Sequence, residues 1–180
     1  MGILVVTAPI TDVRVTIAAP RELIFEMAAA VGGTLPGGPP HASELISRAG
    51  DLMVVRYSAP APFRFVGFVE EVRLTAPTRI DYRVLEGPLD RVEEWLIFDE
   101  IAGGTTVTYG GIVEHRLPLL GPLVARFVAV PAYRVFMKRT LVALKYAAER
   151  RAARSRRYPR TDASPAIQRP SPPPIDHRSA

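Results

Sequence analysis

The chain has 180 residues, of which 48% are hydrophobic and 23% charged, so it can form one globular domain with a sizeable core. It contains no cysteine, which excludes disulfides, thiolate catalysis and cysteine-ligated zinc. The net charge of +5 does not indicate a nucleic-acid-binding domain, because eight arginines and two aspartates lie within residues 150–180. Residues 1–149 carry 15 basic and 16 acidic residues and are nearly neutral.

Residues 1–11 are predicted to be an N-terminal extension. They are apolar, but they lack the basic start of a signal peptide and are interrupted by Pro9. No apolar run in the chain approaches the roughly 20 residues that a membrane-spanning helix needs. The simplest expectation is a cytoplasmic protein without a transmembrane segment.

A strand and a helix are predicted next. Residues 12–18, DVRVTIA, alternate apolar and polar side chains, as a half-buried strand does. Pro20 suits the start of a helix, and Gly32 and Gly33 would end it. Between them, apolar residues recur at helical spacing: Leu23, Ile24, Met27, Ala28 and Val31.

Six further strands are predicted between Ala42 and Leu117, and short connections rich in glycine and proline separate them. Six strands in succession indicate an antiparallel meander. The strands are placed at 42–49, 52–58, 63–75, 78–86, 91–101 and 105–117. The last has the clearest alternation, with Val107, Tyr109, Gly111, Val113, His115 and Leu117 on one face.

The pattern becomes helical after Pro118. Residues 119–129 are predicted to be helical, and Pro131 should produce a kink or a restart. Beyond it lies a long amphipathic helix whose apolar stripe contains Tyr133, Phe136, Met137, Thr140, Leu141, Leu144, Ala147 and Ala148. Residues 155–180, rich in arginine and proline, are predicted to be a disordered tail.

These elements predict one α+β domain over residues 12–154. A curved antiparallel sheet of about seven strands must cover its apolar face, and only the long C-terminal helix is available to do so. A strongly twisted sheet wrapped around one helix leaves space between them. We therefore expect an apolar cavity between sheet and helix, where a ligand could bind.

Several segments, in this order, resemble the START-like or helix-grip superfamily (Bet v 1-like, SRPBCC), and within it the polyketide cyclase/dehydrase-like branch. They are VRVTIAAPRELIFEM, GFVEEVRLTAPTRIDYRVLEGP, GGTTVTY and LVALKYAAER, and together they span about residues 12–150. The resemblance implies a pocket between the sheet and the last helix. It does not specify an activity, because this superfamily includes lipid carriers, hormone receptors and cyclases.

Three residues are candidates for acid–base chemistry. His115 is the histidine within a clear strand and could exchange protons near neutral pH, or it could simply form a hydrogen bond at the strand end. Tyr109 could polarise a ligand carbonyl or belong to the core. Glu94 would become an acid if it pointed inward, but we favour an outward, solvated side chain, and Glu70 and Glu71 have the same two alternatives.

The remaining candidates are contacts to the ligand. Thr140 is the polar residue within the apolar stripe, and the favoured interpretation is a hydrogen bond to its own helix. The predicted lining consists of Tyr109, Val113, His115, Phe127, Phe136, Met137, Thr140, Leu141 and Leu144. No metal site and no cofactor are expected, because His41 and His177 lie in a loop and in the tail.

The leading functional hypothesis is a binding module that carries or sequesters a hydrophobic small molecule, such as a lipid, a quinone or a polyketide-like compound. The alternative is an enzyme of the polyketide cyclase or dehydratase type that uses acid–base residues in the same cavity. The arginine-rich tail could make weak contact with an anionic surface, whereas no specific nucleic-acid binding is expected. The sequence leaves the oligomeric state open.

Overall fold

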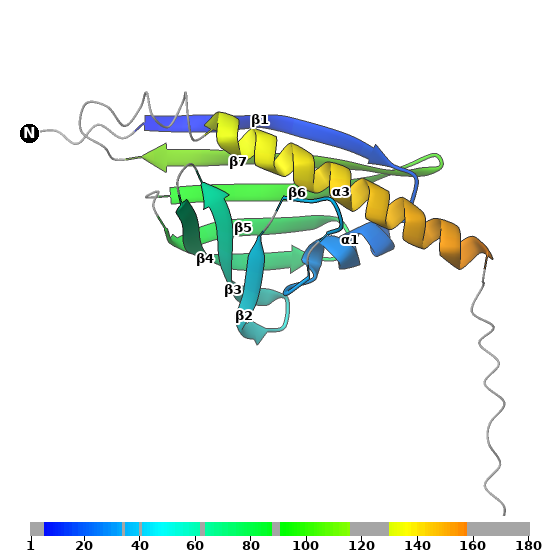
Figure 1. The fold of residues 1–180 in the computed structure, drawn as a ribbon, viewed down its shortest axis with the longest axis horizontal. Coiled ribbons are helices and arrows are strands. Elements are labelled where there is room, and N and C mark those ends of the chain that lie inside the picture. Colours follow the sequence, from blue (N-terminus) through cyan, green and yellow to red (C-terminus); the bar gives the residue numbers. More distant parts are fainter. Residues whose placement is uncertain are drawn as a thin grey trace, which may run out of the picture.

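The computed structural model describes residues 6–33, 35–39, 41–61, 64–87, 91–115 and 130–157. They form an α+β domain in which helix α3 lies across one face of an antiparallel sheet (Figure 1). In chain order the elements are β1 (Val6–Ile17), α1 (Arg21–Ala29), β2 (Ala42–Ala49), β3 (Leu52–Ala61), β4 (Arg64–Thr75), β5 (Arg79–Glu86), β6 (Arg91–Ile101), β7 (Gly104–His115) and α3 (Val130–Arg157).

The sheet has seven strands in the order β1-β7-β6-β5-β4-β3-β2. Strands β2 to β7 follow one another as the predicted antiparallel meander. Strand β1 pairs with β7 and forms one edge of the sheet. The sheet is strongly curved, so that β2 and β3 run across the direction of β6 and β7 (Figure 1). The predicted helix-grip architecture is therefore confirmed.

The first strand is longer than the sequence indicated. The prediction began it at residue 12, but β1 begins at Val6, which is opposite His115 on β7. The register shifts between Ile10 and Val13, so a bulge interrupts the alternation on which the prediction relied. Pro9 is tolerated because β1 is an edge strand. Residues 6–11 thus belong to the sheet and not to an extension.

The described part of helix α3 runs from Val130 to Arg157 and contains Pro131. The predicted kink or restart at Pro131 depends on residues before Val130, which lie outside the described residues. The helix continues through Arg157 and so includes the start of the segment predicted to be disordered. The helix predicted at 119–129 and the tail from residue 158 lie outside the described residues.

Two side chains of α3 attach the helix to the end of β1. The Lys145 ammonium donates a hydrogen bond to the Thr16 carbonyl at 2.8 Å, and the Ala18 amide donates to the Glu149 carboxylate at 2.9 Å. Lys145 and Glu149 also pair with each other at 2.5 Å. The Ala18 amide and the Lys145 ammonium lower the pKa of Glu149. These contacts fix where the helix crosses the sheet.

The core lies between the inner face of the sheet and the apolar stripe of α3. Phe98 and Val107 on the sheet and Leu141 and Leu144 on the helix are almost completely buried. Within the described part of the chain, no helix is long and apolar enough to cross a bilayer.

Candidate functional site

A cavity of about 490 Å³ lies beside this core, between the inner face of the sheet and α3. This volume falls within the range typical of small-molecule sites. Its walls come from α1, the segment 30–43, strands β2 to β7 and α3. Most of the lining is apolar, but one wall, formed by β3 to β7, carries five ionisable side chains: Tyr57, Glu70, Tyr82, Glu94 and Tyr109.

The strand alternation explains why Glu94 faces inward. On β6 the buried residues are Val92, Glu94, Leu96 and Phe98, so Glu94 shares its face with the core. The carboxylate is thus enclosed, with Glu94 only 8% exposed. The favoured prediction of an outward, solvated Glu94 is wrong. It failed because the run Trp95–Phe98 is uniformly apolar, which hides which residues of the strand face the core.

Glu94 accepts a hydrogen bond from the Tyr109 hydroxyl on the neighbouring strand β7. Burial raises the pKa of Glu94 to about 7, although the hydrogen bond from Tyr109 lowers it. The residue opposite Glu94 on β7 is Gly111, and a Cβ atom there would lie 3.2 Å from the Glu94 Cγ. The absence of a side chain at position 111 therefore leaves room for the carboxylate.

Glu70 on β4 is a second inward carboxyl group and is only 4% exposed. Burial, and then the nearby Glu94, raise its pKa well above the usual value. Its direction was one of the two alternatives that the sequence left open. Counting back along β4 from the apolar Val72 and Leu74 would have placed Glu70 on their face. A pair of adjacent glutamates offers no other signal of which one is buried.

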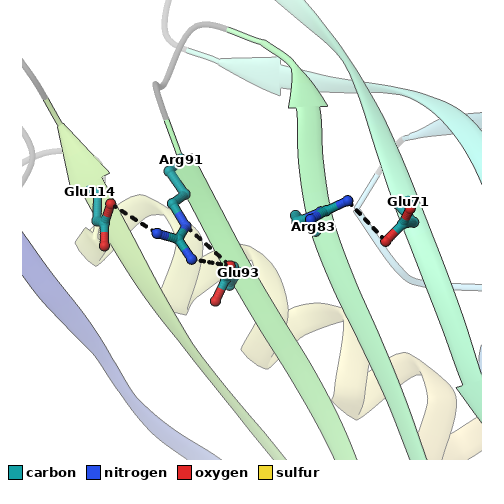
Figure 2. A network of polar contacts seen from close by, with 5 residues as sticks. All are labelled: Glu71, Arg83, Arg91, Glu93 and Glu114. Atoms are coloured by element: carbon teal, nitrogen blue, oxygen red, sulfur yellow. Dashed lines mark hydrogen bonds and ion pairs between the residues drawn. The ribbon is translucent and has the colours of Figure 1, made fainter.

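The adjacent Glu71 faces the other side of the sheet. There its carboxylate pairs with Arg83 at 3.2 Å (Figure 2). Farther along the same outer face, Arg91 pairs with Glu93 at 2.7 Å and with Glu114 at 3.5 Å. Arg83 and Arg91 thus pair with carboxylates on the outer face of the sheet.

Three tyrosines also belong to the wall formed by β3 to β7, which we call the polar wall. Besides Tyr109, which is buried, Tyr57 on β3 and Tyr82 on β5 line the cavity and are half-buried. Burial raises the pKa of the Tyr57 and Tyr82 hydroxyls, and the neighbouring glutamates raise it further. The Tyr57 ring stacks on Phe68, with 5.8 Å between ring centroids.

The opposite wall is apolar and comes from α3. Phe136, Met137, Leu141 and Leu144 line the cavity, where the sequence placed them. Thr140 also lies there, and its hydroxyl donates to the Phe136 carbonyl at 3.0 Å, as predicted. An amphipathic ligand could therefore pack its hydrocarbon on the helix and direct a polar group at the sheet.

Other predicted contacts fall elsewhere. Val113 is fully buried in the core opposite Val92 and is absent from the cavity lining, which corrects its prediction as a lining residue. His115 ends β7 beside Val6, and its side chain lies outside the description, as does all of Phe127. Whether these two contact a ligand stays a prediction. Among the described residues, no three histidine, aspartate or glutamate side chains are grouped so as to hold a metal ion.

No protein-family model matches the chain, and no curated protein matches its sequence. Solved structures do match. The Zhui aromatase/cyclase from Streptomyces sp. R1128 has 23% identity and a TM-score of 0.72, over 81% of this chain and 95% of that one. The protein TTHA0849 from Thermus thermophilus has 22% identity and a TM-score of 0.63, over 82% and 99%.

A third match is a START superfamily protein from Mycobacterium smegmatis, with 19% identity and a TM-score of 0.57, over 83% of this chain and 97% of that one. Identities at this level establish a common fold and leave the activity open. The chain therefore has a helix-grip fold similar to those of the Zhui aromatase/cyclase and of the START superfamily protein from Mycobacterium smegmatis.

Proposed function

We propose that the protein binds a small, largely hydrophobic molecule in the cavity and transfers protons on it, as a cyclase or dehydratase does. One observation carries this proposal: Glu94 and Tyr109 are hydrogen-bonded to each other on the wall of the cavity. A carrier needs an apolar cavity and an opening. Buried ionisable side chains with perturbed pKa values are concentrated in active sites, and Glu94 is such a side chain.

The chemistry follows from the properties of Glu94. With a pKa raised to about 7, its carboxyl group exists in both protonation states near neutral pH. The carboxylate would remove a proton from the carbon beside a ligand carbonyl, which gives an enolate. The carboxylic acid would return that proton to a departing β-hydroxyl, so that the C–O bond breaks, water leaves and Glu94 is regenerated.

The likeness to the Zhui aromatase/cyclase supports this reaction class as a proposal, because that protein has the same fold. A carrier function is the second candidate. It is favoured by the extensive apolar wall of α3, which would hold a ligand by burial alone.

The test begins with native mass spectrometry of the purified protein and extraction of any molecule that stays bound. Proton transfer is then measured with 2-tetralone in D2O, by following loss of the signals of its activated C–H groups. We expect the wild-type protein to catalyse exchange and Glu94→Gln to lose it. Glu71→Gln is the matched control, since Glu71 is the outward neighbour of Glu70.

The outcomes separate the two candidates. Exchange that is absent in Glu94→Gln and normal in Glu71→Gln supports the enzyme. Exchange that persists in Glu94→Gln contradicts it. Bound ligand without any exchange in the wild-type protein favours the carrier.

A further inference from the structure

The polar wall of the cavity lacks a cation. Glu94 lies close enough to Glu70 to raise its pKa, and both side chains are more than nine-tenths buried. Tyr109 donates a hydrogen bond to Glu94. Among the described residues, no lysine or arginine forms an ion pair with either carboxyl group. Two buried carboxyl groups close together are destabilising when ionised unless a cation compensates them, so their presence calls for an explanation.

The basic residues of the described chain do not supply the missing charge. On the outer face of the sheet, Arg83 and Arg91 pair with outward glutamates (Figure 2). Two basic side chains line the cavity, Arg151 and His41. Arg151 is exposed, and the His41 ring bonds the Pro39 carbonyl at 3.0 Å. The deep wall is left acidic.

Aromatic rings line the same side of the cavity as the two carboxyl groups. Tyr57, Phe68, Tyr82 and Tyr109 line the same wall, and the Tyr57 and Phe68 rings stack on one another. The face of an aromatic ring attracts cations, and this attraction is greatest in a site from which water is excluded. Carboxyl groups and aromatic rings on one wall of a cavity form an environment suited to an organic cation.

We propose that Glu70 and the rings around it bind the protonated nitrogen of a hydrophobic amine, which supplies the cation that this wall lacks. The hydrocarbon part of the amine packs on Met137, Leu141 and Leu144 of α3. A carboxylate or phosphate in the same place meets charge of its own sign. This inference rests on the ligand-binding part of the proposed function and is independent of proton transfer by Glu94.

The test uses three probes that share one ring system: 2-naphthylmethylamine, 2-naphthalenemethanol and 2-naphthoate. Binding of each to the full chain is measured by calorimetry near neutral pH. We expect the amine to bind about tenfold more tightly than the naphthoate, the effect of one charge-assisted hydrogen bond. Glu70→Gln should remove most of this preference, and Glu71→Gln should preserve it.

A second measurement needs no variant of Glu70. Binding of the amine to the wild-type protein should strengthen from about pH 5 to about pH 8, because the carboxyl groups lose protons while the amine keeps its own. The affinity for 2-naphthalenemethanol, which carries no charge, should stay constant over this pH range. The other ionisable groups lining the cavity are Glu26, His41, Tyr57, Tyr82, Glu94, Tyr109 and Arg151. The same pH series is repeated with the His41→Gln variant, so that a change in the charge of the His41 imidazole cannot account for the pH dependence of amine binding.

The results distinguish this inference from the proposed function. The inference is overturned if 2-naphthylmethylamine and 2-naphthalenemethanol bind with equal affinity and neither Glu70→Gln nor pH changes the affinity for the amine. That result leaves the ligand-binding role intact. If none of the three probes binds, both the inference and that role are contradicted. An amine preference that follows Glu70 supports the inference, whatever the outcome of the exchange experiment.

Discussion

Tyr109 on β7 donates a hydrogen bond to Glu94 on β6, although the residues directly opposite them are Leu96 and Gly111. The contact is diagonal across the two strands, and such neighbours are within reach of a long aromatic side chain. It places a hydroxyl and a carboxyl group on the cavity wall, 15 residues apart in sequence. Four predictions depend on this wall and on the helix that covers it.

The first prediction concerns Tyr109→Phe. Removing the hydroxyl takes away the hydrogen bond that lowers the pKa of Glu94, so this pKa should rise above its value of about 7. The free energy of unfolding should fall by about 1 kcal/mol. Carbon-detected NMR titration of the glutamate carboxyl groups measures the shift. Tyr146→Phe, at an exposed tyrosine of α3, is the control, and an unchanged Glu94 titration would contradict the assigned contact.

The second prediction concerns the pH dependence of stability. The pKa of Glu94 is raised from 4.5 to about 7 in the folded protein, which therefore binds this proton more tightly than the unfolded chain. The free energy of unfolding should then decrease as pH rises from about 4.5 to about 7, by about 3 kcal/mol from this group. Urea unfolding across this range should show a smaller decrease in Glu94→Gln. A wild-type protein that gains stability over the same range would refute the prediction.

The third prediction concerns the glycine opposite Glu94. A Cβ atom at position 111 would lie 2.8 Å from the Glu93 carbonyl oxygen and 3.0 Å from the Ile10 Cδ1, so Gly111→Ala must displace the backbone of β6 or β7 and shift the Ile10 side chain. We expect a loss of about 1–3 kcal/mol and altered Glu94 titration. Gly67→Ala on β4 is the matched control, because its nearest atom would be 3.8 Å away. Similar stability of the two variants, measured by urea unfolding, would be inconsistent with this packing.

The fourth prediction compares the two sides of α3. Leu144 is 2% exposed and lines the cavity, whereas Val142 is 37% exposed. Leu144→Ala should reduce the free energy of unfolding by about 2–5 kcal/mol, and Val142→Ala by about 0.5 kcal/mol or less. Thermal and urea unfolding test both. Equal effects would mean that the helix does not cover the sheet as described.

Much of the fold was predictable because it depends on local chemistry. Alternation and glycine or proline turns located six of the seven strands to within a few residues, and helical spacing located the buried stripe of α3. The missed start of β1 has a local cause, since a bulge and Pro9 interrupt its alternation. The same helical spacing also identified apolar residues that line the cavity, such as Met137 and Leu144.

The polar wall could not be found in this way. Alternation along β4 places Glu70 on the face of Val72 and Leu74, but it does not show that this part of the face lines a cavity. Which inward side chains of different strands lie beside one another depends on the register of the sheet. The sequence by itself thus determined the elements, their order and the apolar helix face, because periodicity is a property of the chain. Only the tertiary structure decided that Glu70, Glu94 and Tyr109 meet at one cavity, because strand pairing brings together residues that are far apart in sequence.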